Sequence, residues 1–205
     1  MKKKKILVTG ASRGIGLSIA QKLLDSGYGV IGSARKTPFG EDLKENPAFT
    51  EIICDLENDQ AAINILKPLF DNDNSPEVLV NNAAVFEDSD LTEDDTKWLD
   101  VWDRTMQVNL RASSVLSKWA LSYWIKNNVE GIIINIASRA AYRGDTGEYA
   151  AYAASKAGMV AFTKSIYRSV GKYGITAFSI APGFVKTDMA ENSISVYGKE
   201  YLTQD

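Results

Sequence analysis

The chain has 205 residues, of which 45% are hydrophobic and 24% are charged, and its formal net charge is −3. This length and composition are ordinary for a globular protein with a sizeable core. The small net charge argues against broad electrostatic attraction to nucleic acid or anionic lipid. With no histidine and a single cysteine, the chain cannot form a Ser-His-Asp triad, a histidine metal site or an internal disulfide.

Several features favour a cytoplasmic protein that binds neither membrane nor nucleic acid. The one cysteine, Cys54, lies in the apolar run TEIICDL and is expected to fill the core, and a single thiol fits a reducing compartment. No window approaches the roughly 18 apolar residues of a membrane span. The lysine run 2–5 reads as a solvated terminus, and the apolar run after it is too short for a signal peptide.

Short apolar runs alternate with amphipathic segments along the whole chain. The runs are β-branched and nearly continuous, which is typical of strands covered on both faces. The expected strands are KILVTG (5–10), GVIGSA (29–34), FTEIICD (49–55), EVLVNNA (77–83), GIIINIAS (131–138) and GITAFSIAPG (174–183).

Helices are expected between these strands. They cover 15–26, 59–70, 103–127 and 149–173, and the polar stretch 86–100 is expected to be a surface connection, with or without a short helix of its own. Repeated strand–helix alternation predicts an α/β protein with a single doubly wound parallel sheet, a Rossmann fold. We expect one domain over residues 1–205.

The stretch TGASRGIG (9–16) follows the first expected strand and opens the first helix. Gly10, Gly14 and Gly16 permit a tight turn, and the start of the helix then directs free N–H groups at a pyrophosphate. Taken by itself, the motif has an alternative interpretation as a tight strand–helix turn that binds no ligand. The strand before it and the helix after it favour a dinucleotide site.

Two arginines predict NADP(H) in preference to NAD(H). NAD sites usually carry an acid about 20 residues beyond the glycines, but here the second strand ends in Ser33-Ala34-Arg35 and the first acid is Glu41. Together with Arg13 in the glycine turn, Arg35 suits a 2′-phosphate because guanidinium groups bind phosphate bidentately. Two solvated surface arginines are the alternative.

The stretch GEYAAYAASKAG (147–158) contains two tyrosines and one lysine. Tyr152 and Lys156 stand four residues apart in an expected helix, so their side chains share a face. The ammonium group is expected to lower the pKa of the phenol, which makes it a usable acid or base. Tyr149 has Ala153 at the same offset and lacks such a partner. The small side chains predict close approach of a ligand or of another helix.

Six motifs in order along the chain resemble the short-chain dehydrogenase/reductase family. They are Gly10-x-x-x-Gly14-x-Gly16, NNAA (81–84), VNL (108–110), NIAS (135–138), YAASK (152–156) and APGFVKTDM (181–189). The sequence is most similar to the 3-oxoacyl-[acyl-carrier-protein] reductase group. The resemblance implies hydride transfer between a carbonyl and a secondary alcohol, a small-molecule or carrier-bound substrate, and a homo-oligomer (dimer or tetramer).

The resemblance also implies the roles of four catalytic residues. Tyr152 would exchange a proton with the substrate oxygen, and Lys156 would bind the nicotinamide ribose and tune that tyrosine. Ser138 would hold the carbonyl, and Asn109 would anchor a water that relays protons to Lys156. Taken singly, Ser138 has a strand-end turn as its alternative role, and Asn109 a helix kink or cap.

The cofactor would be bound by residues from several loops and from the tyrosine–lysine pair. Asp55 would meet the adenine edge, Asn82 the adenosine side, and Thr187 the carboxamide. No metal is expected. The full implied set is Gly10, Ser12, Arg13, Gly14, Ile15, Gly16, Arg35, Asp55, Leu56, Asn82, Ala83, Tyr152, Lys156, Pro182, Gly183, Val185 and Thr187.

The sequence departs from the family in two places. Ala84 stands where the family usually has glycine. In the family a further helix, a seventh strand and a tail follow the APGFVKTDM loop, so we expect a six-stranded sheet without its usual last edge and a chain truncated at its C-terminus. A natural short form is the alternative. Residues 190–205 would fall in a mobile lid over the substrate pocket.

Two other classes of function are alternatives to an oxidoreductase. A regulatory protein could bind NADP(H) without reacting, and a structural or partner-binding domain would leave the glycine turn unexplained. The polar cleft-side residues Arg139, Tyr142, Arg143 and Asp145 are compatible with a carrier-bound acyl thioester, a sugar or a small hydroxy compound.

Overall fold

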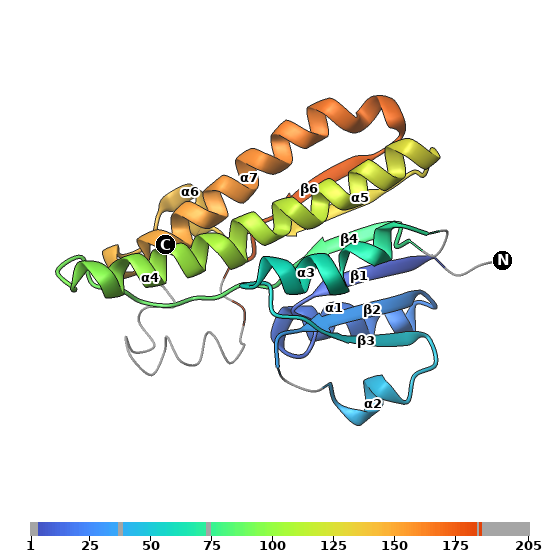
Figure 1. Cartoon of the computed structure of the whole chain (residues 1–205), viewed down its shortest axis with the longest axis horizontal. Coiled ribbons are helices and arrows are strands. Elements are labelled where there is room, and N and C mark those ends of the chain that lie inside the picture. The colour runs from blue at the N-terminus through green and yellow to red at the C-terminus, as the bar shows by residue number, and fades with distance from the viewer. Residues whose placement is uncertain (1–3, 37–38, 73–74, 184, 186–205) are drawn as a thin grey trace.

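Six parallel strands form the centre of the protein, in the order β3-β2-β1-β4-β5-β6 (Figure 1). The computed structural model describes residues 4–36, 39–72, 75–183 and 185. The chain order of the strands reverses between β1 and β4, which is the doubly wound Rossmann order and confirms the predicted fold class. The strands are β1 Lys5–Thr9, β2 Gly29–Ala34, β3 Phe49–Ile53, β4 Val78–Asn81, β5 Ile132–Ile136 and β6 Thr176–Ile180.

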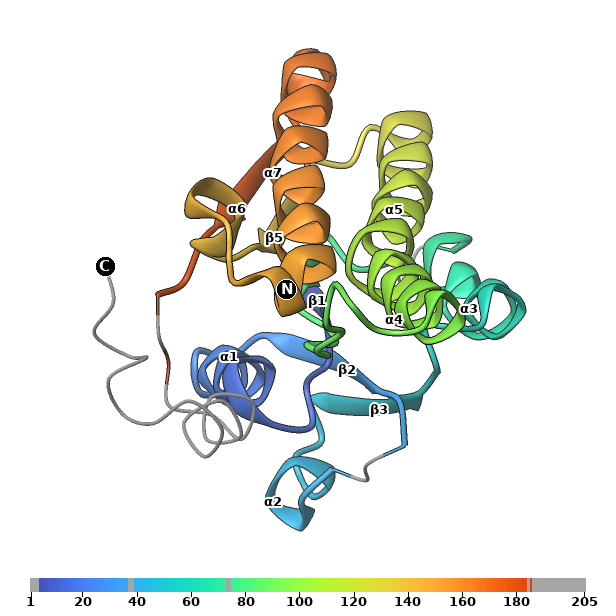
Figure 2. The same ribbon diagram turned by 90° about the vertical axis from the view of Figure 1, so that its left-hand side faces the viewer.

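Helices cover both faces of this sheet. In Figure 2, α3, α5 and α7 lie on one face, and α1 and α2 lie on the other. The α-helices are α1 Gly14–Asp25, α2 Glu41–Lys44, α3 Asp59–Ile65, α4 Asp95–Met106, α5 Ser113–Asn127, α6 Ala140–Arg143 and α7 Ala150–Val170. Shorter turns are the 3-10 segments η1 Lys67–Phe70, η3 Gly147–Tyr149 and η4 Gly171–Tyr173, and the π-helical segment η2 Gln107–Ala112.

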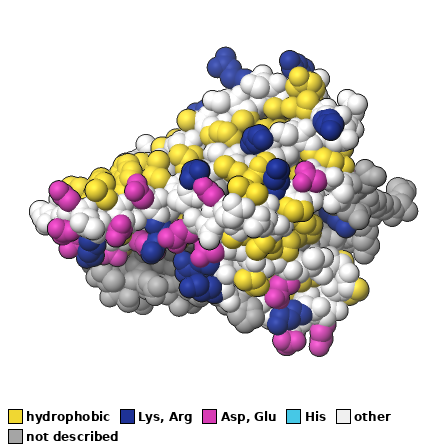
Figure 3. Space-filling model, in the orientation of Figure 1, with side chains coloured by type: hydrophobic (Ala, Val, Ile, Leu, Met, Phe, Trp, Pro, Cys, Tyr) yellow, Lys and Arg dark blue, Asp and Glu magenta, His cyan; other side chains and the backbone are white. Residues whose placement is uncertain are grey.

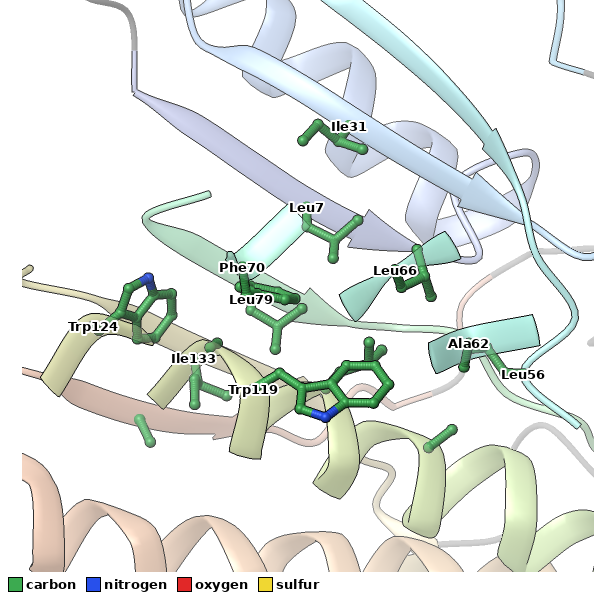
Figure 4. Close-up of a cluster of buried hydrophobic side chains, with 14 of the residues drawn as sticks. Leu7, Ile31, Leu56, Ala62, Leu66, Phe70, Leu79, Trp119, Trp124 and Ile133 are labelled. Carbon is green, nitrogen blue, oxygen red and sulfur yellow. The ribbon is translucent and has the colours of Figure 1, made fainter. Parts of the chain in front are cut away.

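Successive side chains of the central strands point to opposite faces of the sheet, so the core has two parts. Leu7, Leu79 and Ile133 point toward α3 and α5, where Trp119 and Trp124 join them (Figure 4). Their neighbours in the strands pack on the opposite face, against α1 and Phe39. Both faces of the central strands β1 and β4 are therefore buried, which explains the continuous apolar runs that form them.

Helix α4 begins earlier than the expected start at Asp103. The carboxylate of Asp94 accepts a hydrogen bond from the Thr96 amide (3.0 Å) and so caps a helix that starts at Asp95. Trp98 and Trp102 stack one turn apart on it, with ring centroids 5.1 Å apart. The sequence left a short helix within 86–100 open, and the many acidic residues masked its start, although Trp98, Val101 and Trp102 stand at helical spacing (i, i+3, i+4).

β6 forms one edge of the sheet in the described part of the chain, and β3 forms the other. Phe178 and Ile180 on β6 are about half exposed (52% and 49%). Thr187 and the expected lid 190–205 lie outside the described residues. Over the described ranges, no helix is long and apolar enough to cross a membrane.

Replacing Leu79 by alanine should destabilise the fold strongly. Leu79 lies on the central strand β4 and is fully buried, so Leu79→Ala removes packing and leaves a cavity at a cost of about 2–5 kcal/mol. Urea denaturation measures this loss of unfolding free energy. Leu99→Ala is the matched control, because Leu99 is 51% exposed on α4 and its truncation should change stability by less than about 0.5 kcal/mol. Equal effects of the two substitutions would contradict the assigned core.

Candidate active site

The turn between β1 and α1 depends on two glycines with positive φ. Gly10 (φ 65°) and Gly14 (φ 55°) adopt a backbone conformation that L side chains rarely take. A Cβ on Gly10 would lie 2.9 Å from the Cα of Ala83. Arg13 occupies the N-cap of α1 without a side-chain capping bond, so the first N–H groups of the helix remain open to a ligand.

Gly16 does not line the cavity next to this turn. A Cβ there would lie 2.2 Å from the carbonyl oxygen of Gly10 and 2.5 Å from Nδ2 of Asn82. Gly16 therefore permits α1 to pack against the turn. The direct cofactor contact that the motif implied for Gly16 stays a prediction.

Hydrogen bonds join this turn to the end of β4. Asn82 Nδ2 donates to the carbonyls of Thr9 (2.9 Å) and Gly10 (3.1 Å). Thr9 Oγ1 accepts in return from the amides of Asn82 and Ala83, both at 3.0 Å. The family resemblance implied an adenosine-side contact for Asn82 and no role for Thr9. In the structure both residues fix the shape of the glycine turn.

One cavity of about 430 Å³ contains most of the predicted site, a volume in the usual range for small-molecule pockets. It runs along the carboxyl ends of the strands, from the glycine turn to α7. Gly16 and Asn109 do not line it, and Thr187 is outside the described residues. The predicted residues that do line it are Gly10, Ser12, Arg13, Gly14, Ile15, Arg35, Asp55, Leu56, Asn82, Ala83, Ser138, Tyr152, Lys156, Pro182, Gly183 and Val185.

Arg13 and Arg35 both line the cavity at its β1–β2 end and are exposed. Neither guanidinium forms an ion pair within the described part of the chain. Lys36 lines the same end. Three cations therefore meet where the second strand ends, which is the place that the sequence predicted for a 2′-phosphate.

Cys54 lies beneath the cavity and is 4% exposed, in the core as predicted. Burial, together with the nearby Asp55 carboxylate, raises the pKa of its thiol to about 11. A thiol that stays protonated is a weak nucleophile. Clusters of three or more metal-ligating side chains are absent over the described residues.

The other end of the cavity contains the tyrosine–lysine pair of α7. Tyr152 hydrogen-bonds with the Ser138 hydroxyl, which follows β5. Lys156 Nζ lies 5.7 Å from the centroid of the Tyr152 ring and donates to the carbonyl of Ile136 at 2.8 Å. Three side chains that are distant in sequence therefore meet at one point.

The pKa of Tyr152 is opposite in direction to the sequence prediction. Burial raises the pKa of the phenol, the hydrogen bond from Ser138 lowers it, and the Asp145 carboxylate raises it further. Burial also lowers the pKa of Lys156 from its ordinary value of 10.5 to about 8. Removal from water disfavours the charged form of both groups, an effect that residue spacing could not reveal.

Asn109 lies behind the cavity, in the π-helical segment η2, and is fully buried. Its Oδ1 accepts from the Val85 amide (2.8 Å), and its Nδ2 donates to the Val85 carbonyl (3.0 Å) and to Ser155 Oγ (3.1 Å). The Ser155 hydroxyl donates to the carbonyl of Tyr152 (2.7 Å). Asn109 therefore connects the loop after β4 to α7, and its role in a water relay stays a prediction.

Gly158 explains part of the small-residue pattern on α7. A Cβ there would lie 2.7 Å from Cδ2 of Leu110 in η2. The small residue therefore permits close approach of a neighbouring helix, which is one of the two alternatives, and close approach of a ligand stays a prediction.

Sequence reasoning missed a residue of the cavity, Phe86, and an ion-pairing residue outside the cavity, Arg104. Phe86, just after β4, lines the cavity. Arg104 of α4 pairs with Glu57 (3.2 Å) and Glu87 (3.4 Å), which lie in the loops after β3 and β4. Figure 3 shows acidic and basic side chains next to one another over this part of the surface. No motif marks these contacts, because they join three segments through exposed side chains.

Three features define the class of protein as a Rossmann-fold oxidoreductase. They are the doubly wound sheet, the glycine turn where the strand order reverses, and the Ser–Tyr–Lys group in the same cavity. The chain belongs to the short chain dehydrogenase family, whose sequence profile matches residues 4–197. Enzymes of this class interconvert carbonyl and alcohol groups.

Curated relatives and solved structures agree with this family. The 3-oxoacyl-[acyl-carrier-protein] reductase FabG of Vibrio cholerae is 36% identical over 188 residues, which cover 90% of this chain and 75% of that protein. The structure of 4-hydroxyisoleucine dehydrogenase complexed with NADH has a TM-score of 0.86 and 29% identity, and covers 98% of this chain and 80% of that one. A variant of actinorhodin polyketide ketoreductase with NADPH has a TM-score of 0.81 and 30% identity, with 97% and 77% covered.

The buried Lys156 should make stability depend on pH. Its pKa is about 8 in the folded protein and 10.5 ordinarily, so between these values the unfolded chain binds more protons and stability rises with pH. Between about pH 7.5 and 9.5 the wild type should gain on the order of 2 kcal/mol relative to Lys156→Met. Urea denaturation at several pH values measures this difference in slope. Parallel pH profiles of the two proteins would show that Lys156 titrates normally.

Proposed function

We propose that the protein is an NADP(H)-dependent oxidoreductase that interconverts a carbonyl and a secondary alcohol, with Tyr152 as proton donor or acceptor. The observation that supports this most is the meeting of Ser138, Tyr152 and Lys156 in the cavity that also contains the glycine turn. A binding protein that only senses the nucleotide would not need a proton donor beside a hydroxyl and an ammonium group.

The residues present fit a bound dinucleotide. The positive φ angles of Gly10 and Gly14 and the open N-terminus of α1 form a cradle that a Cβ would fill. Arg13 and Arg35 would hold a 2′-phosphate, and Lys156 would hold the nicotinamide ribose. When bound, the cofactor supplies or accepts the hydride.

The side chains at the α7 end of the cavity would transfer the proton and hydrogen-bond to the substrate oxygen. A phenol ordinarily has a pKa of 10.0, and burial raises that of Tyr152 further. Tyr152 therefore holds its proton at neutral pH and can donate it to a carbonyl oxygen as negative charge develops there. The Ser138 hydroxyl provides a second hydrogen bond to the same oxygen. Lys156, with a pKa of about 8, can carry a positive charge close to the phenol or release a proton.

Two substrate classes are supported by separate observations. The Vibrio cholerae relative is named a 3-oxoacyl-[acyl-carrier-protein] reductase, so a 3-oxoacyl thioester is the first substrate to test. The cavity is also lined by Arg139, Arg143 and Asp145, and such charged side chains favour a sugar or another polar hydroxy compound. A panel of both classes with NADPH distinguishes them. A homo-oligomer and a cytoplasmic location also belong to this proposal.

Removal of the Tyr152 hydroxyl should abolish turnover. Tyr152→Phe keeps the ring but has no proton to donate, so kcat should fall by at least about 100-fold, while the Kd of NADPH stays within about threefold. NADPH oxidation and fluorescence titration measure the two quantities. Tyr167→Phe is the control on the same helix, because Tyr167 is 54% exposed. A Tyr152→Phe variant with wild-type rates would refute the proposed mechanism.

The arginine pair should set cofactor preference. The wild type should bind NADPH more tightly than NADH, and Arg35→Asp should weaken NADPH binding by about 10–100-fold, the value of one or two charge-assisted hydrogen bonds. Titration of wild type and variant with both cofactors tests this. Arg168→Asp, which places the same charge change in the last turn of α7, should leave both affinities unchanged. Tighter binding of NADH by the wild type would contradict the proposed preference.

A further inference from the structure

Phe86 contacts both tyrosines of the stretch 147–158. Its ring stacks on Tyr149, with centroids 4.0 Å apart and an interplanar angle of 6°. It meets Tyr152 edge to face, with centroids 4.8 Å apart and an angle of 88°. The three rings therefore form one aromatic cluster, with Phe86 between the other two.

We propose that Phe86 is a positioning residue that fixes the Tyr152 ring in the cavity, and that Tyr149 in turn fixes Phe86. The inference rests on the proposed function, because it assigns the orientation of the side chain that would exchange the proton. It gives Tyr149 a role that the spacing of the two tyrosines along the chain did not indicate.

The cluster restricts the ring of Tyr152 by contact. Stacked and edge-to-face pairs are favourable by about 0.5–1.5 kcal/mol beyond the area that they bury, so a rotated Tyr152 would lose the contact with Phe86. Tyr149 is 6% exposed and offers a fixed surface behind Phe86. A displacement of the reacting group by about 1 Å can cost roughly 100-fold in rate.

The loop that carries Phe86 is itself held on both sides. Val85, the residue before it, makes two hydrogen bonds with Asn109 (2.8 and 3.0 Å). Beyond it, the amide of Ser89 donates to the carbonyl of Glu148 at 3.0 Å, beside Tyr149. Phe86 therefore projects from a loop that is fixed to η2 and to η3, and its ring can transmit this fixed position to Tyr152.

Phe86 also reaches the cavity, whereas Tyr149 does not line it. The Phe86 ring shields one part of Tyr152 from water and so contributes to the burial that raises the pKa of the phenol. A side chain of similar volume without a ring would fill the space but would not provide the edge-to-face contact.

Kinetics of three variants test the inference. Phe86→Leu should lower kcat for carbonyl reduction by about 10–100-fold, while KM and the Kd of NADPH stay within about threefold. Phe86→Tyr keeps the ring and should recover most of kcat. Tyr167→Leu is the control and should leave kcat unchanged, because Tyr167 is an exposed residue of α7, the helix that carries Tyr152. Wild-type kcat in Phe86→Leu, or a loss confined to KM, would overturn the proposal.

A double-substitution cycle tests the part assigned to Tyr149. Tyr149→Leu alone should lower kcat, and it should add little in the Phe86→Leu background, because the two rings act through one contact. Fully additive losses would show that Tyr149 acts independently of Phe86. Melting temperatures of each variant with NADPH separate loss of folding from loss of rate.

An NMR measurement does not depend on turnover. In protein labelled at the tyrosine Cζ, the resonance assigned by its loss in Tyr152→Phe should shift or broaden in Phe86→Leu and stay single in Phe86→Tyr. An unchanged Tyr152 resonance in Phe86→Leu would overturn the positioning role even in an active enzyme. A shifted resonance in a protein that reduces no carbonyl would keep the positioning role and refute the proposed function.

Discussion

The hydrogen bonds between Thr9 and Asn82 hold the carboxyl ends of β1 and β4 together, where the order of strands reverses. In a parallel sheet this point opens a crevice, because the crossovers leave in opposite directions. The Asn82 amide fixes the carbonyls of Thr9 and Gly10 at 2.9 and 3.1 Å, and the Thr9 hydroxyl accepts from the amide of Ala83 (3.0 Å). The glycine turn and the loop that leads to Phe86 therefore have a common fixed origin.

From that origin a continuous set of contacts reaches α7. The loop after β4 passes from Ala83 to Val85, which Asn109 holds through both its backbone groups. Asn109 in turn hydrogen-bonds with Ser155, whose hydroxyl donates to the carbonyl of Tyr152. The π-helical segment η2 places Asn109 between these partners, and such segments often occur at functional sites. The position of Tyr152 thus depends on the loop as well as on the helix that carries it.

The sequence predicted the fold more completely than the site. Continuous apolar runs located all six strands, including the partly exposed edge strands β3 and β6. The ordered motifs identified the glycine turn and the Ser138–Tyr152–Lys156 group. The start of α4 was placed too late because its acidic residues suggested a surface connection, although Trp98, Val101 and Trp102 recur there at helical spacing. Contacts such as those of Phe86 with Tyr149 and Tyr152 could not be predicted, since they join the loop after β4 to η3 and α7, which are far apart in the sequence.

The sequence predicted the wrong direction for the pKa shift of Tyr152, for a physical reason that also bears on the chemistry. Spacing along a helix predicts that an ammonium group is near a phenol, but it does not give the depth at which the two are buried. Burial disfavours phenolate and ammonium alike, and it raises the pKa of Tyr152 while it lowers that of Lys156 to about 8. The phenol therefore keeps its proton at neutral pH, which suits donation to a carbonyl oxygen in the reductive direction. Oxidation of an alcohol would require the opposite charge state, and a protonated Lys156 beside the ring would have to stabilise it.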